Sequence, residues 1–281
     1  MQTVAIFGVG LIGGSFALAL RRAGFKGEIL GVSSGSTVSD AVRLGVIDRG
    51  VPLEEAARAA DLVYLAQPIR QILETISLLS GHLKPGALVT DAGSTKVEIV
   101  EQGKRLLGPG QFLGGHPMAG KEVRGVSAAE AGLFQGRTYF LCAQDQFMAD
   151  HPIAKELLNY VVRFGASPVL LAAEEHDRLV SLTSHLPQLA STALASVLSK
   201  LLEPQVASRG AGPGLIDMTR LAQSSYDLWA DILFTNATLI DRALGLYINE
   251  LQTIRDSLSR QDIGTTFDQA SKFAAFVRKP R

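Results

Sequence analysis

The chain has 281 residues, which is enough for a large core and for two domains. Its 27 lysine and arginine residues equal its 27 aspartate and glutamate residues, so no bulk charge favours nucleic acid or an anionic membrane as a partner. Cys142 is the one cysteine, which excludes an internal disulfide and fits a reducing cytoplasm, and no Cys/His cluster has the spacing of a metal site.

The first predicted element is the apolar run Val4–Phe7, whose β-branched residues are typical of a buried parallel strand. A G-x-G-x-x-G motif follows it and leads into an amphipathic helix, which is the context of a dinucleotide-binding loop. The free N–H groups at the start of this helix suit a pyrophosphate. No positive charge precedes the apolar stretch, so a signal peptide is excluded. The predicted cofactor contacts of the loop are Gly8, Gly10, Leu11, Ile12 and Gly13.

The second predicted strand, Glu28–Val32, ends in Ser33 and Ser34, at the place where a dinucleotide fold usually has a ribose-binding acid. Two small hydroxyl groups can donate hydrogen bonds to a 2′-phosphate, which a carboxylate would repel. No cation follows closely to pair with that phosphate, since the nearest is Arg43. We therefore expect NAD or NADP as cofactor, with NADP favoured. A serine turn that caps the next helix is the alternative.

Two further buried strands, Leu62–Ala66 and Ala87–Thr90, are followed by loops that should line the cofactor site, since ligands bind outside the carboxyl ends of such strands. The first of these loops begins with Gln67 and Pro68, which we predict as cofactor contacts. The second contains Ser94, and either Ser94 or Thr95 is expected to be the N-cap of the next helix. The predicted helices of this region are Ser39–Leu44, Leu53–Ala60, Ile69–Leu79 and Ile153–Phe164.

His116 lies between two glycines and a proline, at the end of the predicted strand Gln111–Gly115. This position faces the same crevice as the glycine loop, so His116 is a candidate base that accepts a hydroxyl proton during hydride transfer. Two more strands are predicted, Arg137–Cys142 and Pro168–Leu171.

The pattern becomes helical from Glu174 onward. His176–Lys200 is a helical stretch interrupted by Pro187, Gln205–Gly214 is predicted as a glycine-rich loop, and Tyr226–Ser259 as one very long helix with an a/d heptad seam. A helix of this length, roughly 50 Å, should pack partly against a second chain; an intramolecular bundle is the alternative. The fold class is therefore α/β: a Rossmann-type dinucleotide-binding domain (1–170) followed by an all-helical dimerisation domain (171–281).

Four motifs together resemble the prephenate/arogenate dehydrogenase family of tyrosine biosynthesis. They extend over nearly the whole chain, in order and with similar spacing. The motifs are Gly114–Gly120 (GGHPMAG), Asp91–Lys96 (DAGSTK), Ser184–Pro187 (SHLP) and Asp217–Arg220 (DMTR) with Trp229.

The resemblance implies NAD(P)-dependent oxidative decarboxylation of prephenate or arogenate by a cytoplasmic homodimer. By matching position, His116 would hydrogen-bond the C4 hydroxyl of the substrate and act as base. Ser94 would orient that hydroxyl and the His116 ring. Arg220 would pair with a substrate carboxylate, because its planar fork binds carboxylate with two parallel hydrogen bonds. His185 would line the pocket and Glu122 its rim.

Several positions depart from the family pattern. Gln188 stands where many members have a second histidine, and it should face the side chain that distinguishes prephenate from arogenate. Lys121 replaces a common threonine, and Ser33 replaces the ribose-binding acid. Trp229, which matches the family, would either wall the pocket or lie in the helix core. The chain has no room for a chorismate mutase or ACT domain, so tyrosine feedback through such a domain is not expected. The alternatives are a related hydroxyacid or imine dehydrogenase and a non-catalytic nucleotide-sensing dimer.

Overall fold

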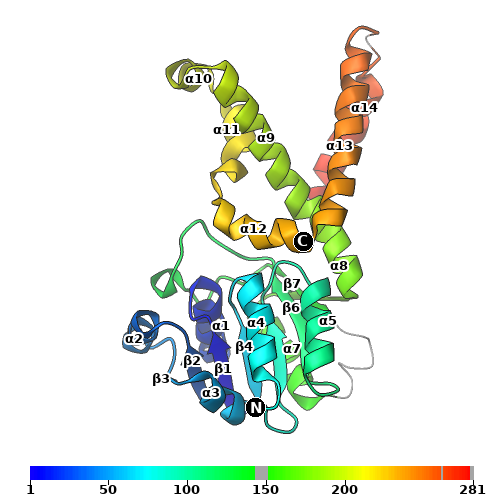
Figure 1. The fold of residues 1–281 in the computed structure, drawn as a ribbon. Helices are drawn as coiled ribbons and strands as arrows, with labels where there is room; N and C mark the ends of the chain where they lie inside the picture. The colour runs from blue at the N-terminus through cyan, green and yellow to red at the C-terminus, as the bar shows by residue number, and fades with distance from the viewer. Residues whose placement is uncertain (143–150, 261, 279–281) are drawn as a thin grey trace. The chain divides into compact units, whose positions relative to one another are not determined.

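The computed structural model describes residues 1–142, 151–260 and 262–278. Within them, eight strands form one sheet in the order β3-β2-β1-β4-β5-β6-β7-β8 (Figure 1). Neighbours from β3 to β6 are parallel, and β7 pairs antiparallel with β6 and parallel with β8. The strands are β1 (Thr3–Phe7), β2 (Glu28–Val32), β3 (Arg49–Gly50), β4 (Leu62–Leu65), β5 (Leu88–Asp91), β6 (Phe112–Pro117), β7 (Thr138–Cys142) and β8 (Ser167–Leu171).

The sheet is buried on both faces, as its continuous apolar strands predict. Along β1, Val4 and Ile6 belong to one core cluster, and Ala5 and Phe7 belong to the other. Helices α1 and α7 contribute to the first cluster, and α3, α4 and α5 contribute to the second. The helices are α1 (Leu11–Arg22), α2 (Gly35–Arg43), α3 (Leu53–Ala59), α4 (Ile69–Leu79), α5 (Val97–Leu106), the 3₁₀ turn η1 (Val126–Ala128) and α7 (Pro152–Arg163).

The described residues after β8 form helices and turns only. A π-helical turn joins the first two of these helices, and Pro187 lies in the first turn of the second. The elements are α8 (Ala173–Val180), η2 (Ser181–His185), α9 (Leu186–Leu201), α10 (Pro204–Gly210), α11 (Pro213–Thr219), η3 (Arg220–Gln223), α12 (Tyr226–Thr235), α13 (Ala237–Leu258) and α14 (Gly264–Val277). This sequence of elements has the α/β-then-helical fold class that was predicted.

The chain forms two compact units, Met1–Ala237 and Thr238–Arg281. The sheet and the helices from α8 to α12 therefore belong to one unit, and almost all of α13 together with α14 belongs to the other. The domain boundary predicted near residue 170 stays a prediction.

Two expectations for the helical part are wrong. Gln205–Gly214 is not a loop, because Pro204 and Pro213 each begin a short helix, α10 and α11. Tyr226–Ser259 is not one helix, because the helical hydrogen bonding is interrupted at Asn236, which separates α12 from α13. The sequence also did not indicate α14 or the two-residue strand β3.

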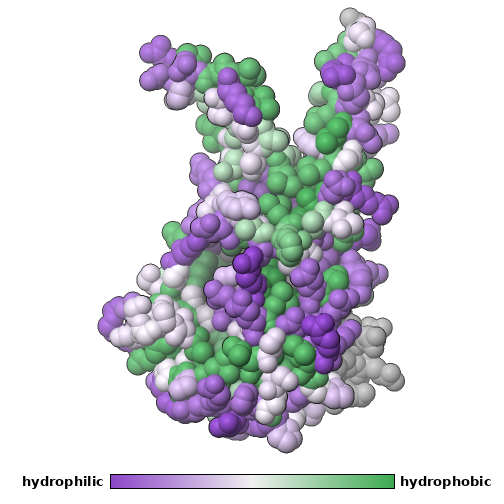
Figure 2. Space-filling model, in the orientation of Figure 1, coloured by the Kyte–Doolittle hydropathy of each residue, from purple (hydrophilic) through white to green (hydrophobic). Residues whose placement is uncertain are grey.

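Large apolar side chains are exposed in each unit. In the first unit one group of them lies along α9, α10 and α11, where Figure 2 shows apolar surface. Examples are Val197, Leu201, Val206, Ile216 and Met218 in this group, and Leu246, Leu251, Leu258, Phe267, Phe273 and Phe276 in the second unit. No helix in the described residues is both long and apolar enough to span a membrane.

Candidate active site

The predicted site residues follow neighbouring strands of the sheet. Because β2, β1, β4, β5 and β6 are adjacent and parallel, the loops at their carboxyl ends lie along one edge. In that order the edge carries Ser33, Gly8, Gln67 and Ser94, and then His116 near the end of β6. The topology thus places the predicted cofactor-binding loops and the candidate base on one edge of the sheet.

The glycine loop is tightly packed at Gly8 and Gly13 and open at Gly10. Gly8 has a φ of +85°, and a side chain there would be 2.6 Å from the carbonyl oxygen of Ala66. A side chain at Gly13 would be 2.2 Å from the carbonyl oxygen of Gly8, which explains the close approach of α1 to β1. Around Gly10, by contrast, the space is open. Gly10 is the N-cap residue of α1 and provides no side-chain cap, so the first N–H groups of the helix, at Leu11 and Ile12, remain available to an anion.

The serine turn after β2 begins α2. Ser34 is the N-cap residue but makes no capping hydrogen bond, and its hydroxyl instead donates to Thr37 Oγ1 at 2.9 Å. Ser33 precedes it, directly after β2. Arg43, the nearest following cation, is paired with Asp40 at 2.8 Å on the last turn of the same helix. A 2′-phosphate here would therefore rely on hydroxyl and backbone N–H donors.

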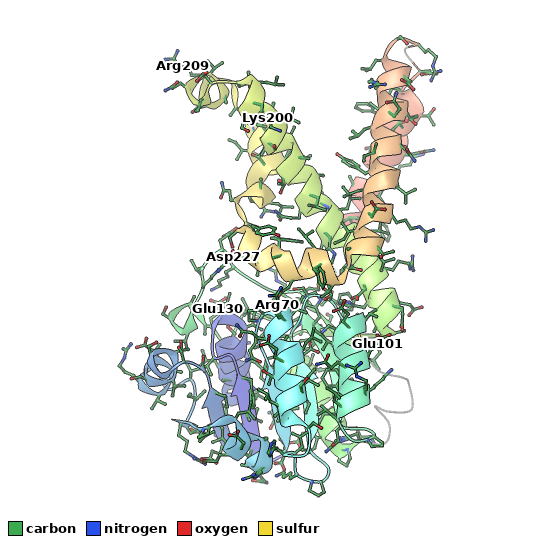
Figure 3. The ribbon with its side chains drawn as sticks, in the orientation of Figure 1. Arg70, Glu101, Glu130, Lys200, Arg209 and Asp227 are labelled. Carbon is green, nitrogen blue, oxygen red and sulfur yellow. The ribbon has the colours of Figure 1, made fainter. Side chains whose placement is uncertain are left out.

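The loop after β4 lies beside the glycine loop. The Cγ atom of Gln67 is 2.9 Å from where a Gly8 side chain would begin, and Gln67 Oε1 accepts a hydrogen bond from Thr75. Pro68 precedes α4, whose first turn is joined to α12 because the backbone N–H of Arg70 donates to Asp231 Oδ2 at 3.0 Å. Figure 3 shows Arg70 at this junction.

A buried ion pair connects β5 to β6. Asp91 and Lys96 are both fully buried and form an ion pair, and Lys96 Nζ also donates to the carbonyl oxygen of Gly115 at 2.8 Å. Asp91 Oδ1 in turn accepts the N–H of Gly115 at 2.9 Å. These contacts fix both backbone polar groups of the residue that precedes His116. Gly115 must be glycine, since a side chain would lie 2.4 Å from the carbonyl oxygen of Asp91.

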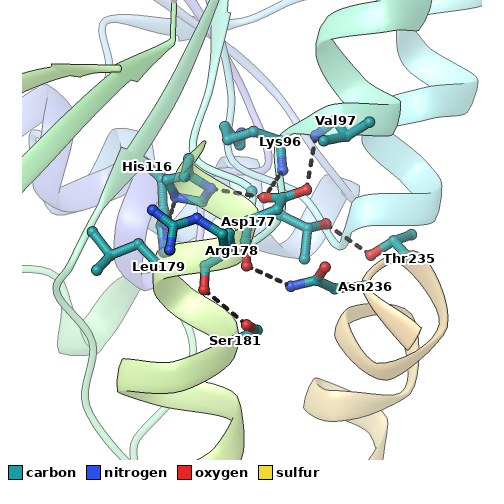
Figure 4. Close-up of polar contacts among 12 residues, drawn as sticks. Lys96, Val97, His116, Asp177, Arg178, Leu179, Ser181, Thr235 and Asn236 are labelled. Carbon is teal, nitrogen blue, oxygen red and sulfur yellow. Dashed lines mark hydrogen bonds and ion pairs between the residues drawn. The ribbon is translucent and has the colours of Figure 1, made fainter. Parts of the chain in front are cut away.

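The expected N-cap of α5 is wrong. The helix begins at Val97 with Lys96 as its N-cap residue, and neither Ser94 nor Thr95 caps it. The capping group is instead Asp177 of α8, which accepts the N–H groups of Lys96 at 2.7 Å and of Val97 at 2.9 Å (Figure 4). Ser94, half-buried, is thus free of a capping role, while the Thr95 hydroxyl contacts the hydroxyl of Thr235 on α12 at 2.7 Å.

His116 is buried and contacts a second histidine. Its Nδ1 lies 2.8 Å from Nε2 of His176, and Nδ1 of His176 lies 2.7 Å from Oδ1 of Asp177. Burial lowers the pKa of His116 well below its ordinary value of 6.5, and the neighbouring His176, Lys96 and His185 act in the same direction. Burial also lowers the pKa of His176, against the opposing effect of Asp177. Both imidazoles are therefore neutral at neutral pH.

Sequence reasoning did not identify His176 and Asp177 as site residues. The only local signal is their position: two adjacent polar residues in the first helix after β8, at the point where the pattern changes from strands to helices. Both lie on the buried side of that helix.

His185 and Gln188, both predicted to face the substrate, are buried. His185 contacts Asn236 at 3.3 Å and packs edge-on against the ring of Trp229, with 5.8 Å between ring centroids. Burial lowers its pKa to about 4. The amide nitrogen of Gln188 donates to the carbonyl oxygen of Leu221 at 2.8 Å, so Gln188 is joined to the backbone next to Arg220.

The predicted carboxylate-binding and rim residues are exposed. Arg220 begins η3, and within the described residues no carboxylate pairs with its guanidinium. Glu122 lies in the loop after β6, next to Lys121, which pairs with Glu130 at 2.8 Å. Trp229 is half-buried and packs against the core cluster of α3, α4 and α5. Among the described residues no cluster of side chains has the composition of a metal site.

A glycine loop between the first strand and the first helix, on the same sheet edge as a buried histidine, is the arrangement of an NAD(P)-dependent dehydrogenase. The family model described as prephenate dehydrogenase, nucleotide-binding domain, matches residues 16–170, and the one described as prephenate dehydrogenase, dimerization domain, matches residues 172–270. The chain belongs to the prephenate dehydrogenase family, as its motifs predicted.

Individual relatives agree with this assignment. The chain is 34% identical over 266 residues to prephenate dehydrogenase of Lactococcus lactis, covering 93% of this chain and 73% of the relative. A crystal structure of prephenate dehydrogenase from Aquifex aeolicus, in complex with hydroxyphenyl propionate and NAD+, superposes with a TM-score of 0.89 at 32% identity over 99% of both chains. Arogenate dehydrogenase of Synechocystis gives a TM-score of 0.82 at 29% identity over 98% of both chains.

Proposed function

We propose that this protein catalyses the NAD(P)-dependent oxidative decarboxylation of prephenate to 4-hydroxyphenylpyruvate, of arogenate to tyrosine, or of both. The observation that carries the proposal is a neutral, buried His116 on the sheet edge that also carries the glycine loop. The relatives named above include both a prephenate and an arogenate dehydrogenase, so both substrates are candidates.

The chain's own residues account for substrate binding and proton movement. His116 accepts the proton of the C4 hydroxyl, and Ser94, from the neighbouring loop, orients that hydroxyl. The exposed Arg220 binds a substrate carboxylate, with His185 and Gln188 beside it and Glu122 at the rim. A bound NAD(P) would supply the hydride acceptor for the C4 hydrogen. Cleavage of the carbon–carbon bond to the ring carboxylate releases carbon dioxide and supplies the electrons that make the ring aromatic. The proton on His116 then returns to the C4 oxygen, so the reaction releases no net proton.

A two-by-two kinetic assay tests this proposal. The purified chain is mixed with prephenate or arogenate and with NAD or NADP, and reduced cofactor is followed by absorbance. Turnover in at least one pairing is expected. No turnover in any of the four would refute the proposal and leave the two alternatives: a related hydroxyacid or imine dehydrogenase, and a nucleotide-sensing dimer that binds cofactor without reaction.

Replacing Arg220 with alanine should mainly raise KM for the substrate, because the cation that pairs with its carboxylate is lost. We expect an increase on the order of 10- to 100-fold, the usual effect of removing a charged hydrogen-bond partner. Steady-state kinetics with the better substrate measure it. Arg209→Ala, on an exposed turn of α10, is the matched control and should leave KM unchanged. Equal KM values for the two variants would remove Arg220 from the binding site.

For the cofactor we propose NADP in preference to NAD, with Ser33 and Ser34 as donors to the 2′-phosphate. Ser33→Asp should reverse this preference, since a carboxylate repels the phosphate and accepts hydrogen bonds from ribose hydroxyls. The measurement is the ratio of kcat/KM with NADP to that with NAD, expected to fall by a factor on the order of 10². A general loss of folded protein lowers both values and leaves the ratio unchanged, so the ratio is its own control. An unchanged ratio would place the 2′-phosphate elsewhere.

We also propose a homodimer formed through the helical residues. The match to a dimerization-domain model over residues 172–270 supports it, and so do the apolar side chains exposed on α9, α10, α11, α13 and α14. The single cysteine is consistent with action in the cytoplasm.

A further inference from the structure

Three buried side chains form a connected series behind the candidate base. They are Asp177, His176 and His116, with hydrogen-bond distances of 2.7 Å and 2.8 Å between successive members. His116 comes from β6 and the other two come from α8, so the series joins the sheet to the first helix after it. Neither His176 nor Asp177 was assigned a part in the proposed reaction.

The hydrogen-bonding capacity of each group determines which ring nitrogens carry protons. A carboxylate accepts hydrogen bonds and donates none, and the oxygens of Asp177 also accept the N–H groups of Lys96 and Val97. Nδ1 of His176 must therefore carry the proton. In a neutral ring Nε2 of His176 is then an acceptor, so Nδ1 of His116 must be the donor. This leaves Nε2 of His116 without a proton.

The unprotonated nitrogen is the one that can reach a substrate. Within the described residues Nε2 of His116 has no hydrogen-bond partner, and it is not among the fully enclosed polar atoms that lack one. Nε2 therefore keeps some accessible surface, while Nδ1 faces His176. The opposite tautomer would present an N–H to the substrate hydroxyl and could not accept its proton.

Asp177 also fixes the loop that carries the second candidate catalytic residue. Its two carboxylate oxygens accept the N–H groups of Lys96 and Val97, which directly follow the segment containing Ser94 (Figure 4). Its own backbone is fixed in turn, because the side-chain amide of Asn236 donates to the carbonyl oxygen of Asp177 at 3.0 Å. One carboxylate thus positions both His116, through His176, and the loop of Ser94.

We propose that Asp177 and His176 are positioning residues that hold His116 as the Nδ1–H tautomer, with Nε2 as the base toward the substrate hydroxyl. The assignment rests on the proposed function for the identity of the reaction. The tautomer itself is a property of the protein and can be measured without substrate.

The direct test is a long-range ¹H–¹⁵N correlation spectrum of the full-length chain, labelled with ¹⁵N-histidine and saturated with oxidised cofactor. Five histidines give five patterns, and His116→Asn identifies the pattern of His116. We expect His116 and His176 both to be neutral Nδ1–H tautomers at pH 7.5. An Nε2–H tautomer at His116 would overturn the proposal whether or not the enzyme turns over prephenate or arogenate.

A pair of variants tests the catalytic consequence. In His176→Gln the amide oxygen can still accept from Nδ1 of His116, whereas the shorter His176→Asn keeps a donor for Asp177 but cannot reach His116. We expect kcat to fall on the order of 10²-fold in His176→Asn, and no more than about tenfold in His176→Gln, with KM within about threefold of wild type in both.

Asp177→Asn replaces an acceptor with an amide that also donates, and it should lower kcat on the order of 10²-fold with the same small change in KM. If all three variants lose kcat and cofactor affinity equally, the two residues are merely structural and the proposal fails. If a variant does not fold, the wild-type spectrum decides. Absence of turnover in the wild type would refute the proposed function and leave the tautomer assignment unaffected.

Discussion

His116→Asn is expected to lower kcat by a factor on the order of 10² to 10⁴, the usual effect of losing a positioned general base. Asparagine preserves a polar side chain in the space of the ring nitrogen near His176 but has no basic atom toward the substrate. KM should change far less than kcat, because the proton is transferred only in the transition state. Steady-state kinetics with the better of prephenate and arogenate measure both constants.

His82→Asn is the matched control, since it makes the same substitution in the turn after α4, outside the site. It should leave kcat unchanged. The pH profile of the wild type adds a second check. Because burial lowers the pKa of His116, the base stays unprotonated at pH 6.5, and kcat should decline only at more acidic pH. A kcat that is equal in both variants would exclude His116 as the base.

Lys96→Met is expected to lower the free energy of unfolding by about 3 to 5 kcal/mol, because it leaves the carboxylate of Asp91 buried without its cation. Both side chains are fully buried, so water cannot replace the lost partner. The substitution also removes the hydrogen bond to Gly115, next to His116. Urea unfolding followed by circular dichroism at pH 7.5 measures the loss.

The control for this prediction is an ion pair on the surface. Arg43→Met breaks the pair with Asp40, whose side chains are both more than half exposed, and should cost no more than about 1 kcal/mol. If Lys96→Met lost no more stability than the control Arg43→Met, the space around Asp91 would have to rearrange and neutralise or hydrate the carboxylate. A double variant with Asp91→Asn should recover part of the stability, because no charge is then left buried.

The sequence predicted the part of the molecule that local patterns determine. Continuous apolar runs located β1, β2 and β4, and the glycine spacing located the start of α1 within the first turn. The place of His116 followed from the same reasoning, since parallel strands carry their binding loops at one edge. These features depend on residues that are close together in the chain.

The errors concern contacts between residues that are distant in the chain. Ser94 and Thr95 are good capping residues, yet α5 is capped by Asp177, about 80 positions later in the sequence. The helical periodicity continues through Asn236, yet the helix ends there, and the Asn236 side chain is buried against the backbone of Asp177. Periodicity cannot reveal such tertiary contacts, which override local propensity.

Glycine content misled the prediction in another way. Gly210, Gly212 and Gly214 indicated a loop, but Pro204 and Pro213 stand in first turns, where proline favours a helix. The glycines accordingly lie at the ends of two short helices. Proline position was the more informative signal in this segment.

Helix α8 has a consequence for attempts to recombine this protein with its relatives. The division between the two family models, after residue 170, assigns His116 to one half and His176 with Asp177 to the other. A chimera joined at that point would inherit the base from one parent and the groups that set its protonation from the other. Crossovers placed after α8, near residue 181, would keep the sheet, His176 and Asp177 together from the same parent.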